Sequence, residues 1–234
     1  MASGSILSKL EERIGYHFKD KSLLKQALTH SSYANEQKIR KNKDYERLEF
    51  LGDAVLELIS SEFLFHENQD MSEGKLTKMR SSLVCEPSLA YCAKEIDLGS
   101  FMLLGKGEEA TGGRLRESII SDVMEALIGA LYLDGGFEIA KAFIYQFVLK
   151  DYKNRILFYD SKTVLQEMIQ TKPNQNLLYE LIEEKGPDHN KEFVVRAMLN
   201  GSKIGFGVGK TKKAAEQQAA YEAILFIKSM EEYQ

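Results

Sequence analysis

Apolar residues recur at three- and four-residue spacing through most of residues 1–157, which is the period of helices with one buried face. Pro87 suits a helix start, and the pair Gly135–Gly136 suits a helix end. Two polar stretches, 37–45 and 105–114, are typical of loops. The pattern therefore predicts an all-α first domain, with helices over 5–18, 21–30, 46–59, 73–96, 117–136 and 137–150.

The pattern changes near residues 157–161. A short helix is predicted over 161–170 and a strand over 177–184. Residues 192–199 alternate at strand period, Asn200–Gly201 is a strong hairpin signal, and 203–209 fits a third strand. A last helix follows, with Thr211 as a suitable N-cap. The sequence predicts all-α residues 1–157 and a small α+β domain of order α-β-β-β-α over 160–230.

Carboxylates form a narrow stripe on the predicted helix 46–59. On a helical wheel the stripe is about 80° wide, and apolar residues cover most of the remaining circumference, so the helix is predicted to be buried on most sides. Aligned carboxylates in such surroundings must take up protons, find basic partners or bind a cation. The stripe consists of Glu46, Glu49, Asp53 and Glu57.

A second acidic patch lies in the strongly apolar segment 118–133. The only charged residues in this segment are Asp122 and Glu125, which are three residues apart and therefore lie on one helix face. Two such helices facing one another would form an oxygen-rich site suited to Mg²⁺ or Mn²⁺ inside a helical bundle. A solvated acidic face explains the same spacing and is favoured for Glu57, so the residues alone leave both interpretations open.

Composition excludes some classes of protein. Hydrophobic residues make up 44% of the chain and charged residues 28%, which favours a folded core. Two cysteines without a histidine cluster indicate neither a zinc site nor a disulfide framework, and a reduced, cytoplasmic setting is expected. Residues 1–15 lack the apolar core of a secretory signal, and 118–133 is too short to span a bilayer, so no membrane partner is expected.

The net charge of −4 argues mildly against a nucleic-acid partner. The charge is unevenly spread, however. Residues 193–215 contain five basic residues and no acidic one. The average charge therefore does not exclude nucleic acid for this segment.

Several motifs resemble the ribonuclease III family in their order and spacing. They are "ALTHSSYANE", "ERLEFLGDAVL", "EGKLTKMRSSLV" and "LRESIISDVMEALIGALYLDGG". Residues 160–229 resemble that family's double-stranded-RNA-binding domain, through "GPDHNKEF" and "KTKKAAEQQAA". The resemblance covers nearly the whole chain after residue 6. One departure is Tyr45, where the family often has Asn.

The resemblance implies a helical endonuclease domain over 1–157, a double-stranded-RNA-binding domain over 160–230, and a homodimer. The expected activity is Mg²⁺-dependent hydrolysis of double-stranded RNA, with Mn²⁺ able to substitute. Products would carry 5′-phosphate and 3′-hydroxyl ends with short 3′ overhangs, and the implied roles are ribosomal-RNA precursor processing and messenger-RNA processing or decay.

Motif positions carry the family's site residues onto this chain. The implied metal ligands are Glu49, Asp53, Asp122 and Glu125, with Asp53 and Glu125 the most essential for catalysis. Glu46 and Glu73 match supporting acids. Phe50 matches an aromatic that packs into the partner subunit, although an ordinary core position would also explain it.

The second domain has the parts needed to bind A-form RNA through phosphates and 2′-hydroxyls. Lys212 and Lys213 begin a helix, where the helix dipole also favours phosphate, and Lys210 precedes them. His189 lies in the loop between the first two strands. The candidates for 2′-hydroxyl contacts are Thr163, Gln166 and Glu167, and for Glu167 a solvated face remains an alternative.

Two other functions are compatible with parts of the sequence. A non-catalytic RNA-binding regulator would keep the second domain and lose the acids, yet all four expected ligands are present. A helical di-metal oxidative enzyme usually has Glu-x-x-His pairs, and none of the four histidines has that spacing.

Overall fold

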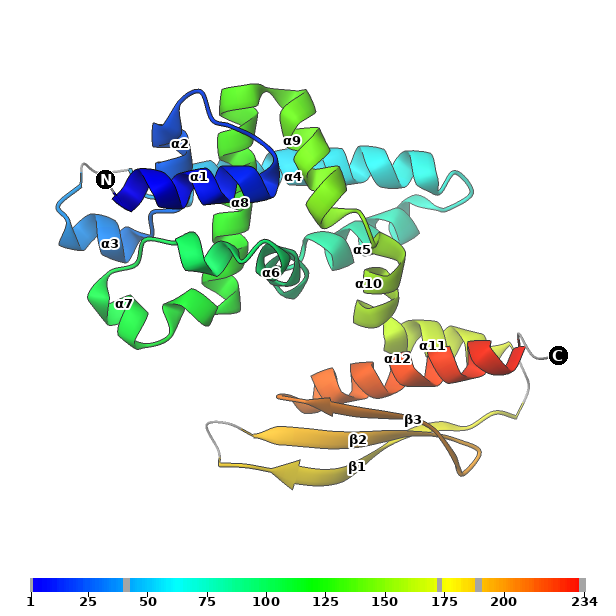
Figure 1. The fold of residues 1–234 in the computed structure, drawn as a ribbon. Helices are drawn as coiled ribbons and strands as arrows, with labels where there is room; N and C mark the ends of the chain where they lie inside the picture. The colour runs from blue at the N-terminus through cyan, green and yellow to red at the C-terminus, as the bar shows by residue number, and fades with distance from the viewer. Residues whose placement is uncertain (1, 40–42, 172–173, 188–190, 232–234) are drawn as a thin grey trace. The chain divides into compact units, whose positions relative to one another are not determined.

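The computed structural model describes residues 2–39, 43–171, 174–187 and 191–231 (Figure 1). The chain divides into two compact units between Tyr152 and Lys153, and each is described by itself. Within the described residues, no helix is both long enough and apolar enough to cross a membrane.

The first unit is helical, as predicted. Its α-helices are α1 (Ala2–Ile14), α2 (Lys21–Ala27), α3 (Ser31–Glu36), α4 (Glu46–Glu67), α5 (Glu73–Val84), α6 (Glu86–Glu95), α7 (Lys106–Ala110), α8 (Glu117–Gly135) and α9 (Phe137–Phe143). Short turns of 3₁₀ helix cover Leu98–Phe101 and Gly113–Leu115, and a π-helical turn covers Ile144–Val148. Pro87 lies in the first turn of α6, and Gly136 ends α8 with a φ of 83°.

Helix α8 lies at the centre of the first unit and packs against α2, α4, α6 and α9 (Figure 1). Its strongly apolar sequence explains this position, because a helix that is hydrophobic on nearly all sides must be covered on nearly all sides. Residues Val123, Leu127 and Leu131 are fully buried. This helix therefore forms the support on which the other helices are placed.

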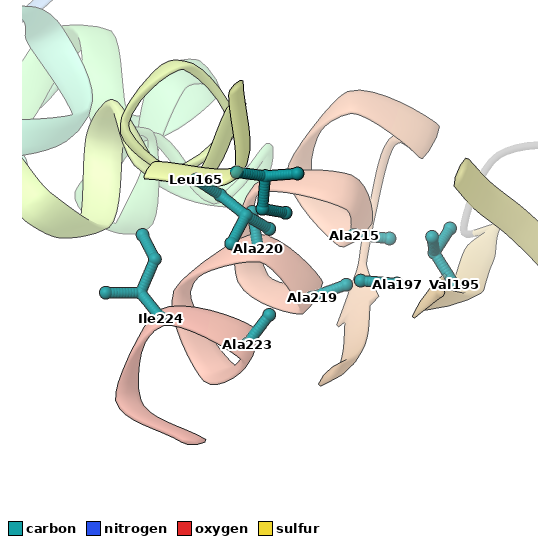
Figure 2. Close-up of a cluster of buried hydrophobic side chains, with 9 residues drawn as sticks. Leu165, Val195, Ala197, Ala215, Ala219, Ala220, Ala223 and Ile224 are labelled. Atoms are coloured by element: carbon teal, nitrogen blue, oxygen red, sulfur yellow. The ribbon is translucent and has the colours of Figure 1, made fainter. Parts of the chain in front are cut away.

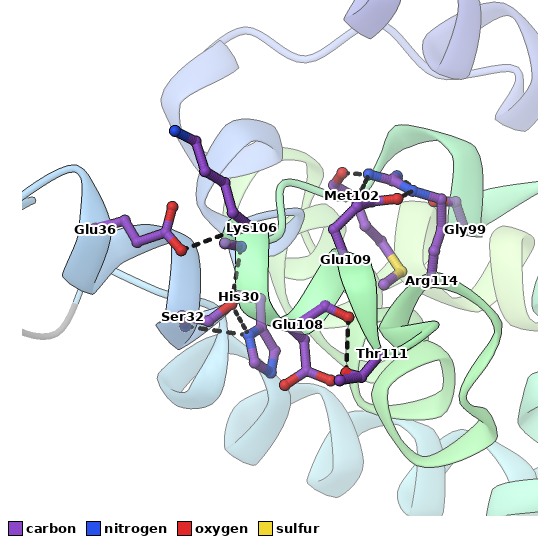
Figure 3. A network of polar contacts seen from close by, with 11 residues as sticks. His30, Ser32, Glu36, Gly99, Met102, Lys106, Glu108, Glu109, Thr111 and Arg114 are labelled. Atoms are coloured by element: carbon purple, nitrogen blue, oxygen red, sulfur yellow. Dashed lines mark hydrogen bonds and ion pairs between the residues drawn. The ribbon is translucent and has the colours of Figure 1, made fainter.

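Residues 105–114 differ from the predicted loop, because they contain α7 and a 3₁₀ turn. Contacts from distant residues stabilise them. The backbone N–H groups of Gly105 and Lys106 donate to Ser32 Oγ (2.9 Å) and Glu36 Oε1 (2.7 Å) (Figure 3). Arg114 donates to the carbonyls of Gly99 and Met102. Polar composition alone could not indicate these tertiary caps.

The second unit begins within α10 (Tyr152–Tyr159) and continues with α11 (Ser161–Gln170), β1 (Leu177–Lys185), β2 (Glu192–Leu199), β3 (Ser202–Gly209) and α12 (Lys212–Glu231). The strands form an antiparallel sheet in the order β1-β2-β3. Asn200 and Gly201 join β2 to β3 with φ values of 51° and 82°, as a type I′ hairpin requires. This confirms the predicted α-β-β-β-α order.

Helices α11 and α12 cover one face of this sheet, and the core lies between these helices and the sheet (Figures 1 and 2). The alternation in β2 is confirmed, since Val195 and Ala197 are fully buried. Helix α12 approaches β3 closely at glycines. A Cβ at Gly205 would lie 2.1 Å from the Ala219 carbonyl oxygen, and one at Gly207 would lie 2.2 Å from that of Ala215.

The beginning of α12 is also as predicted. Thr211 Oγ1 accepts a hydrogen bond from the backbone N–H of Ala214 at 3.1 Å, which is the expected N-cap interaction. The short segment between β3 and α12 is thereby fixed. The lysines that begin α12 consequently have a defined place at the end of the sheet.

Candidate functional site

Helices α4 and α8 cross at two glycines. A Cβ at Gly52 would lie 1.8 Å from the carbonyl oxygen of Glu125, and a Cβ at Gly129 would lie 2.2 Å from that of Leu48. Any side chain larger than hydrogen would hold the helices apart. The crossing therefore brings the acidic stripe of α4 next to the acidic patch of α8.

The two acids of α8 lie where the central part of this helix is accessible to solvent. From Ile119 to Leu131 every residue is buried except Asp122 and Glu125, which are half-buried. On α4, Glu49 is half-buried and Asp53 is exposed. The four predicted metal ligands thus surround one helix crossing, at the edge of the apolar core.

Electrostatic coupling shows that these carboxylates share one environment. Burial raises the pKa of Glu125 to about 8, and repulsion from Asp53, Glu49 and Asp122 adds to the effect. Burial also raises the pKa of Glu49, with repulsion from Asp122 next in size. The pKa values of Asp53 and Asp122 are raised as well, again chiefly by burial. Each acid is therefore harder to ionise than it would be in water.

His30 lowers the pKa of Asp122 slightly, but no ion pair between described residues relieves the repulsion among the four acids. Among the described residues, no ion pair joins a lysine, arginine or histidine to any of the four acids. One polar contact reaches the group: the Tyr45 hydroxyl donates to Asp122 Oδ2 at 3.3 Å. Burial and the neighbouring acids together raise the pKa of the Tyr45 hydroxyl.

The donor chemistry fits a hard divalent cation, since four carboxylates supply only oxygen ligands. The side chains are not gathered into a coordination shell, however. Over the described parts of the chain, no group of three or more acidic, histidine or cysteine side chains lies close enough together to hold a metal ion. The structure brings Glu49, Asp53, Asp122 and Glu125 to one crossing, and their role as ligands stays a prediction.

The remaining acids have different surroundings. Glu46 and Glu57 are exposed on α4, and each adds repulsion, to Glu49 and to Asp53 respectively. Glu73 begins α5, is exposed, and accepts a hydrogen bond from Thr77 Oγ1 at 2.9 Å. No described hydrogen bond or ion pair connects Glu73 to the four acids.

Helix α4 is less buried than predicted. Phe50 is 80% exposed, so the interpretation that it is an ordinary core residue of this chain is wrong. Leu58 and Phe65, on the same helix, are 59% and 66% exposed. The last two border a pocket of about 440 Å³ between α4 and α5, with Leu76 and Arg80. Of this apolar outer face, only Phe50 was singled out from the sequence, as a residue that packs into a partner subunit. The spacings of eight and seven residues along one helix could have indicated Leu58 and Phe65 as well.

The described residues among the predicted RNA-binding set lie on α11 and around the start of α12. On α11, Gln166 and Glu167 are exposed and Thr163 is half-buried. Lys210, Lys212 and Lys213 are exposed around the start of α12. His189 lies outside the described residues.

The first turn of α11 is connected to the second turn of α12. Lys162 donates from its backbone to Gln217 Oε1 at 2.9 Å and forms an ion pair with Glu216 at 2.5 Å. Thr163, the next residue, therefore begins α11 close to the second turn of α12. This pairing fixes the beginning of α11 against α12.

Comparisons with known proteins match both units. Residues 20–152 match a family model described as Ribonuclease-III-like, and residues 161–227 match the double-stranded RNA binding motif. "Ribonuclease 3" of Caldanaerobacter subterraneus subsp. tengcongensis is 50% identical over 222 residues, covering 94% of this chain and 97% of that protein. "Ribonuclease 3" of Bacillus cereus is 52% identical over 220 residues, covering 93% and 90%.

A solved structure supports the fold of the first unit. The nuclease domain of ribonuclease III from Campylobacter jejuni is similar with a TM-score of 0.57 and 46% sequence identity. The similarity covers 62% of this chain and 97% of that one. A helical nuclease domain followed by a small RNA-binding domain is therefore the architecture of this chain.

Proposed function

This chain belongs to the ribonuclease III family and is an endoribonuclease, and from that premise we propose that it hydrolyses double-stranded RNA with Mg²⁺. Products would carry 5′-phosphates, 3′-hydroxyls and short 3′ overhangs. Mn²⁺ would substitute for Mg²⁺. The observation that carries the proposal is the α4–α8 crossing, where four carboxylates with raised pKa values form no ion pair among the described residues.

Glu49, Asp53, Asp122 and Glu125 would hold the ion. When bound, a divalent cation activates the attacking water and neutralises charge on the phosphoryl oxygens. The chain itself supplies concentrated negative charge on a rigid frame. Among the other acids, Asp53 contributes most to the raised pKa of Glu125, so this pair would gain most from a shared cation. Glu46 and Glu73 would have supporting roles.

The second unit would bind the duplex. Exposed Lys212 and Lys213 can meet phosphates at the beginning of α12, and Lys210 adds charge beside them. Thr163, Gln166 and Glu167 on α11 are suited to minor-groove 2′-hydroxyls. His189 completes the predicted set, outside the described residues. We keep 1–157 and 160–230 as the extents of the nuclease and RNA-binding domains.

A homodimer is supported by the outer face of α4. In a two-fold dimer, a protruding residue on one copy fills a pocket that the same surface provides on the other. Phe50 protrudes, and the apolar pocket of about 440 Å³ lies farther along the same helix. A solved relative's nuclease domain is described as having a region involved in dimer formation. Phe50→Glu is expected to give monomers by sedimentation; unchanged dimers would remove this face from the interface.

The substrates in the cell would be ribosomal-RNA precursors and messenger RNAs, in the cytoplasm. The two cysteines are free thiols, which suits a reducing compartment. These roles follow from the family and not from any feature of the site. These roles are tested by measuring how those transcripts are processed in cells that carry an inactive variant as their only copy of this protein.

A long, perfect RNA duplex tests the activity itself. Incubation with Mg²⁺ should give products whose mapped ends are 5′-phosphates and 3′-hydroxyls, and EDTA should prevent cleavage. Glu125→Gln keeps the shape of the side chain and removes its charge, so cleavage should fall by at least about 10³-fold while RNA binding persists. Glu57→Gln, an exposed acid on α4, is the matched control. Cleavage by Glu125→Gln at the wild-type rate would refute the assignment.

A further inference from the structure

Tyr45 is held at both its backbone and its ring. The side chain is buried, with 5% exposure. Its N–H donates to the Thr29 carbonyl at 2.9 Å, and its own carbonyl accepts from the N–H groups of Leu48 and Glu49, which begins α4. Its ring lies 5.7 Å from that of His30, centroid to centroid. These contacts leave the hydroxyl with little freedom.

His30 is itself held in place by hydrogen bonds, so the Tyr45 ring lies against a side chain of fixed position. Its Nδ1 accepts from the Ser32 N–H at 3.1 Å and lies 2.7 Å from Ser32 Oγ (Figure 3). Ser32 in turn accepts from the backbone of Gly105. The position of Tyr45 is thus connected to the polar network that orders α3 and α7.

The Tyr45 hydroxyl points across to α8. It donates to Asp122 Oδ2 at 3.3 Å, and the described residues offer no other hydrogen bond to the side-chain carboxylates of the four acids. Tyr45 stands at the N-cap position of α4, yet its side chain makes no capping bond there. The side chain is therefore used for Asp122 and not for the end of its own helix.

We propose that Tyr45 is a positioning residue that orients the Asp122 carboxylate for divalent-cation binding, an inference that rests on the proposed function. Hydrogen-bond partners of metal ligands fix the orientation of those ligands before the ion arrives. Without the hydroxyl, Asp122 must be ordered when the cation binds, and affinity falls.

Binding of Mn²⁺ to the full-length protein, measured by calorimetry or electron paramagnetic resonance without RNA, tests the inference. Tyr45→Phe removes only the hydroxyl and should weaken Mn²⁺ binding by about tenfold. This is the low end of the loss seen when the hydrogen-bond partner of a metal ligand is removed. Tyr45→Asn, with the residue often found here in the family, has a shorter side chain and should show a similar loss. The Mg²⁺ concentration for half-maximal cleavage should rise in parallel.

Tyr16→Phe is the matched control. The Tyr16 hydroxyl donates to Asp134 Oδ2 at 2.7 Å, which is also a tyrosine–aspartate bond to α8 but at the far end of the helix. Its loss should leave Mn²⁺ binding unchanged. Equal weakening in Tyr16→Phe and Tyr45→Phe would overturn the inference, because the effect would then come from the fold.

Asp122→Asn separates this inference from the proposed function. If Asp122→Asn weakens Mn²⁺ binding and Tyr45→Phe does not, Tyr45 has no positioning role and the metal site stands. If Asp122→Asn also binds Mn²⁺ as the wild type does, the ligand set is wrong and both proposals fail. In the Asp122→Asn background, Tyr45→Phe should cause no further loss; a second tenfold loss would refute action through Asp122.

Discussion

The crossing of α4 and α8 and the beginning of α12 each concentrate charge of one sign, but they differ in burial. At the crossing, carboxylates stand at the edge of an apolar core and raise one another's pKa values. At the start of α12, Lys212 and Lys213 are exposed to solvent, in a first turn that contains no acidic residue. Folding alone favours neither arrangement, since like charges repel and cations are disfavoured at helix N-termini.

The difference in burial matches the difference in ligand. A compact divalent cation must exchange water for fixed oxygen atoms, and that exchange requires carboxylates on a rigid, partly desolvated frame. A phosphate backbone is extended and hydrated, so it is met by exposed lysines that release counterions. Under the proposed function, catalysis would therefore depend on the close packing of two helices, whereas RNA binding would depend on surface charge.

The largest expected effect comes from disturbing the frame of the crossing. Gly52→Ala would place a Cβ 1.8 Å from the Glu125 carbonyl oxygen, so the helices must separate. We expect a loss of roughly 3–5 kcal/mol in the free energy of unfolding, together with loss of cleavage. Urea unfolding of the full chain measures the first effect.

Gly74→Ala is the control for that experiment, because a Cβ at Gly74 meets nothing within 4 Å. It lies in α5, where alanine has the better helix propensity, so stability should stay the same or rise by up to about 1 kcal/mol. If Gly52→Ala were as stable as Gly74→Ala, the close approach of α4 and α8 would not be essential.

The lysines of α12 should respond differently. Lys212→Ala combined with Lys213→Ala should weaken duplex-RNA binding roughly tenfold at moderate salt and reduce the slope of log K against log salt by about 2. Binding is best measured in the Glu125→Gln background, where the RNA is expected to remain intact. The fold should not lose stability, because the change removes cations from a helix N-terminus.

Lys228→Ala, in the last turn of the same helix, serves as the control for the lysine pair. Its charge is equally exposed but lies at the other end of α12. It should leave the salt slope of RNA binding nearly unchanged. An unaltered slope in the double variant would exclude the start of α12 from the RNA interface.

The structure of the second unit could be predicted from the sequence more completely than the geometry of the α4–α8 crossing, and the reason is physical. Asn200–Gly201, Thr211 and the alternation around Val195 act through local backbone rules, so their positions were predictable. The helix in 105–114 depends on contacts from elsewhere in the fold, and the exposure of Leu58 and Phe65 depends on which side of α4 the other helices cover. The acids of the α4–α8 crossing were predicted to meet, but the glycine contact that brings them together was not.

The ionisation of Glu125 gives a smaller effect with a definite sign. Its pKa is raised from an ordinary value of 4.5 to about 8, so the folded protein retains a proton that the unfolded chain loses. The free energy of unfolding therefore falls as pH rises between those two values. Glu125→Gln removes this dependence and should be more stable than wild type at pH 8 in EDTA, by about 1–2 kcal/mol after allowance for solvent screening.

Mg²⁺ should narrow or reverse the stability difference between Glu125→Gln and the wild type. An ion that binds only the folded wild type stabilises that protein by mass action. Thermal unfolding of both proteins from pH 5 to pH 8, in EDTA and in Mg²⁺, measures this. A wild-type stability that rises with pH through this range in EDTA, with no such rise in Glu125→Gln, would contradict the raised pKa.

The smallest expected effect compares the two helix beginnings directly. Thr211 caps α12 through its side chain, so Thr211→Ala should cost about 1 kcal/mol, seen as faster hydrogen exchange of the first α12 amides in the full chain. Tyr45 makes no such capping bond for α4, so Tyr45→Phe should change exchange in the first α4 turn by less than about 0.5 kcal/mol. A larger loss at α4 than at α12 would mean that Tyr45 serves the fold, because a hydroxyl that only orients Asp122 has little to contribute to the stability of its own helix.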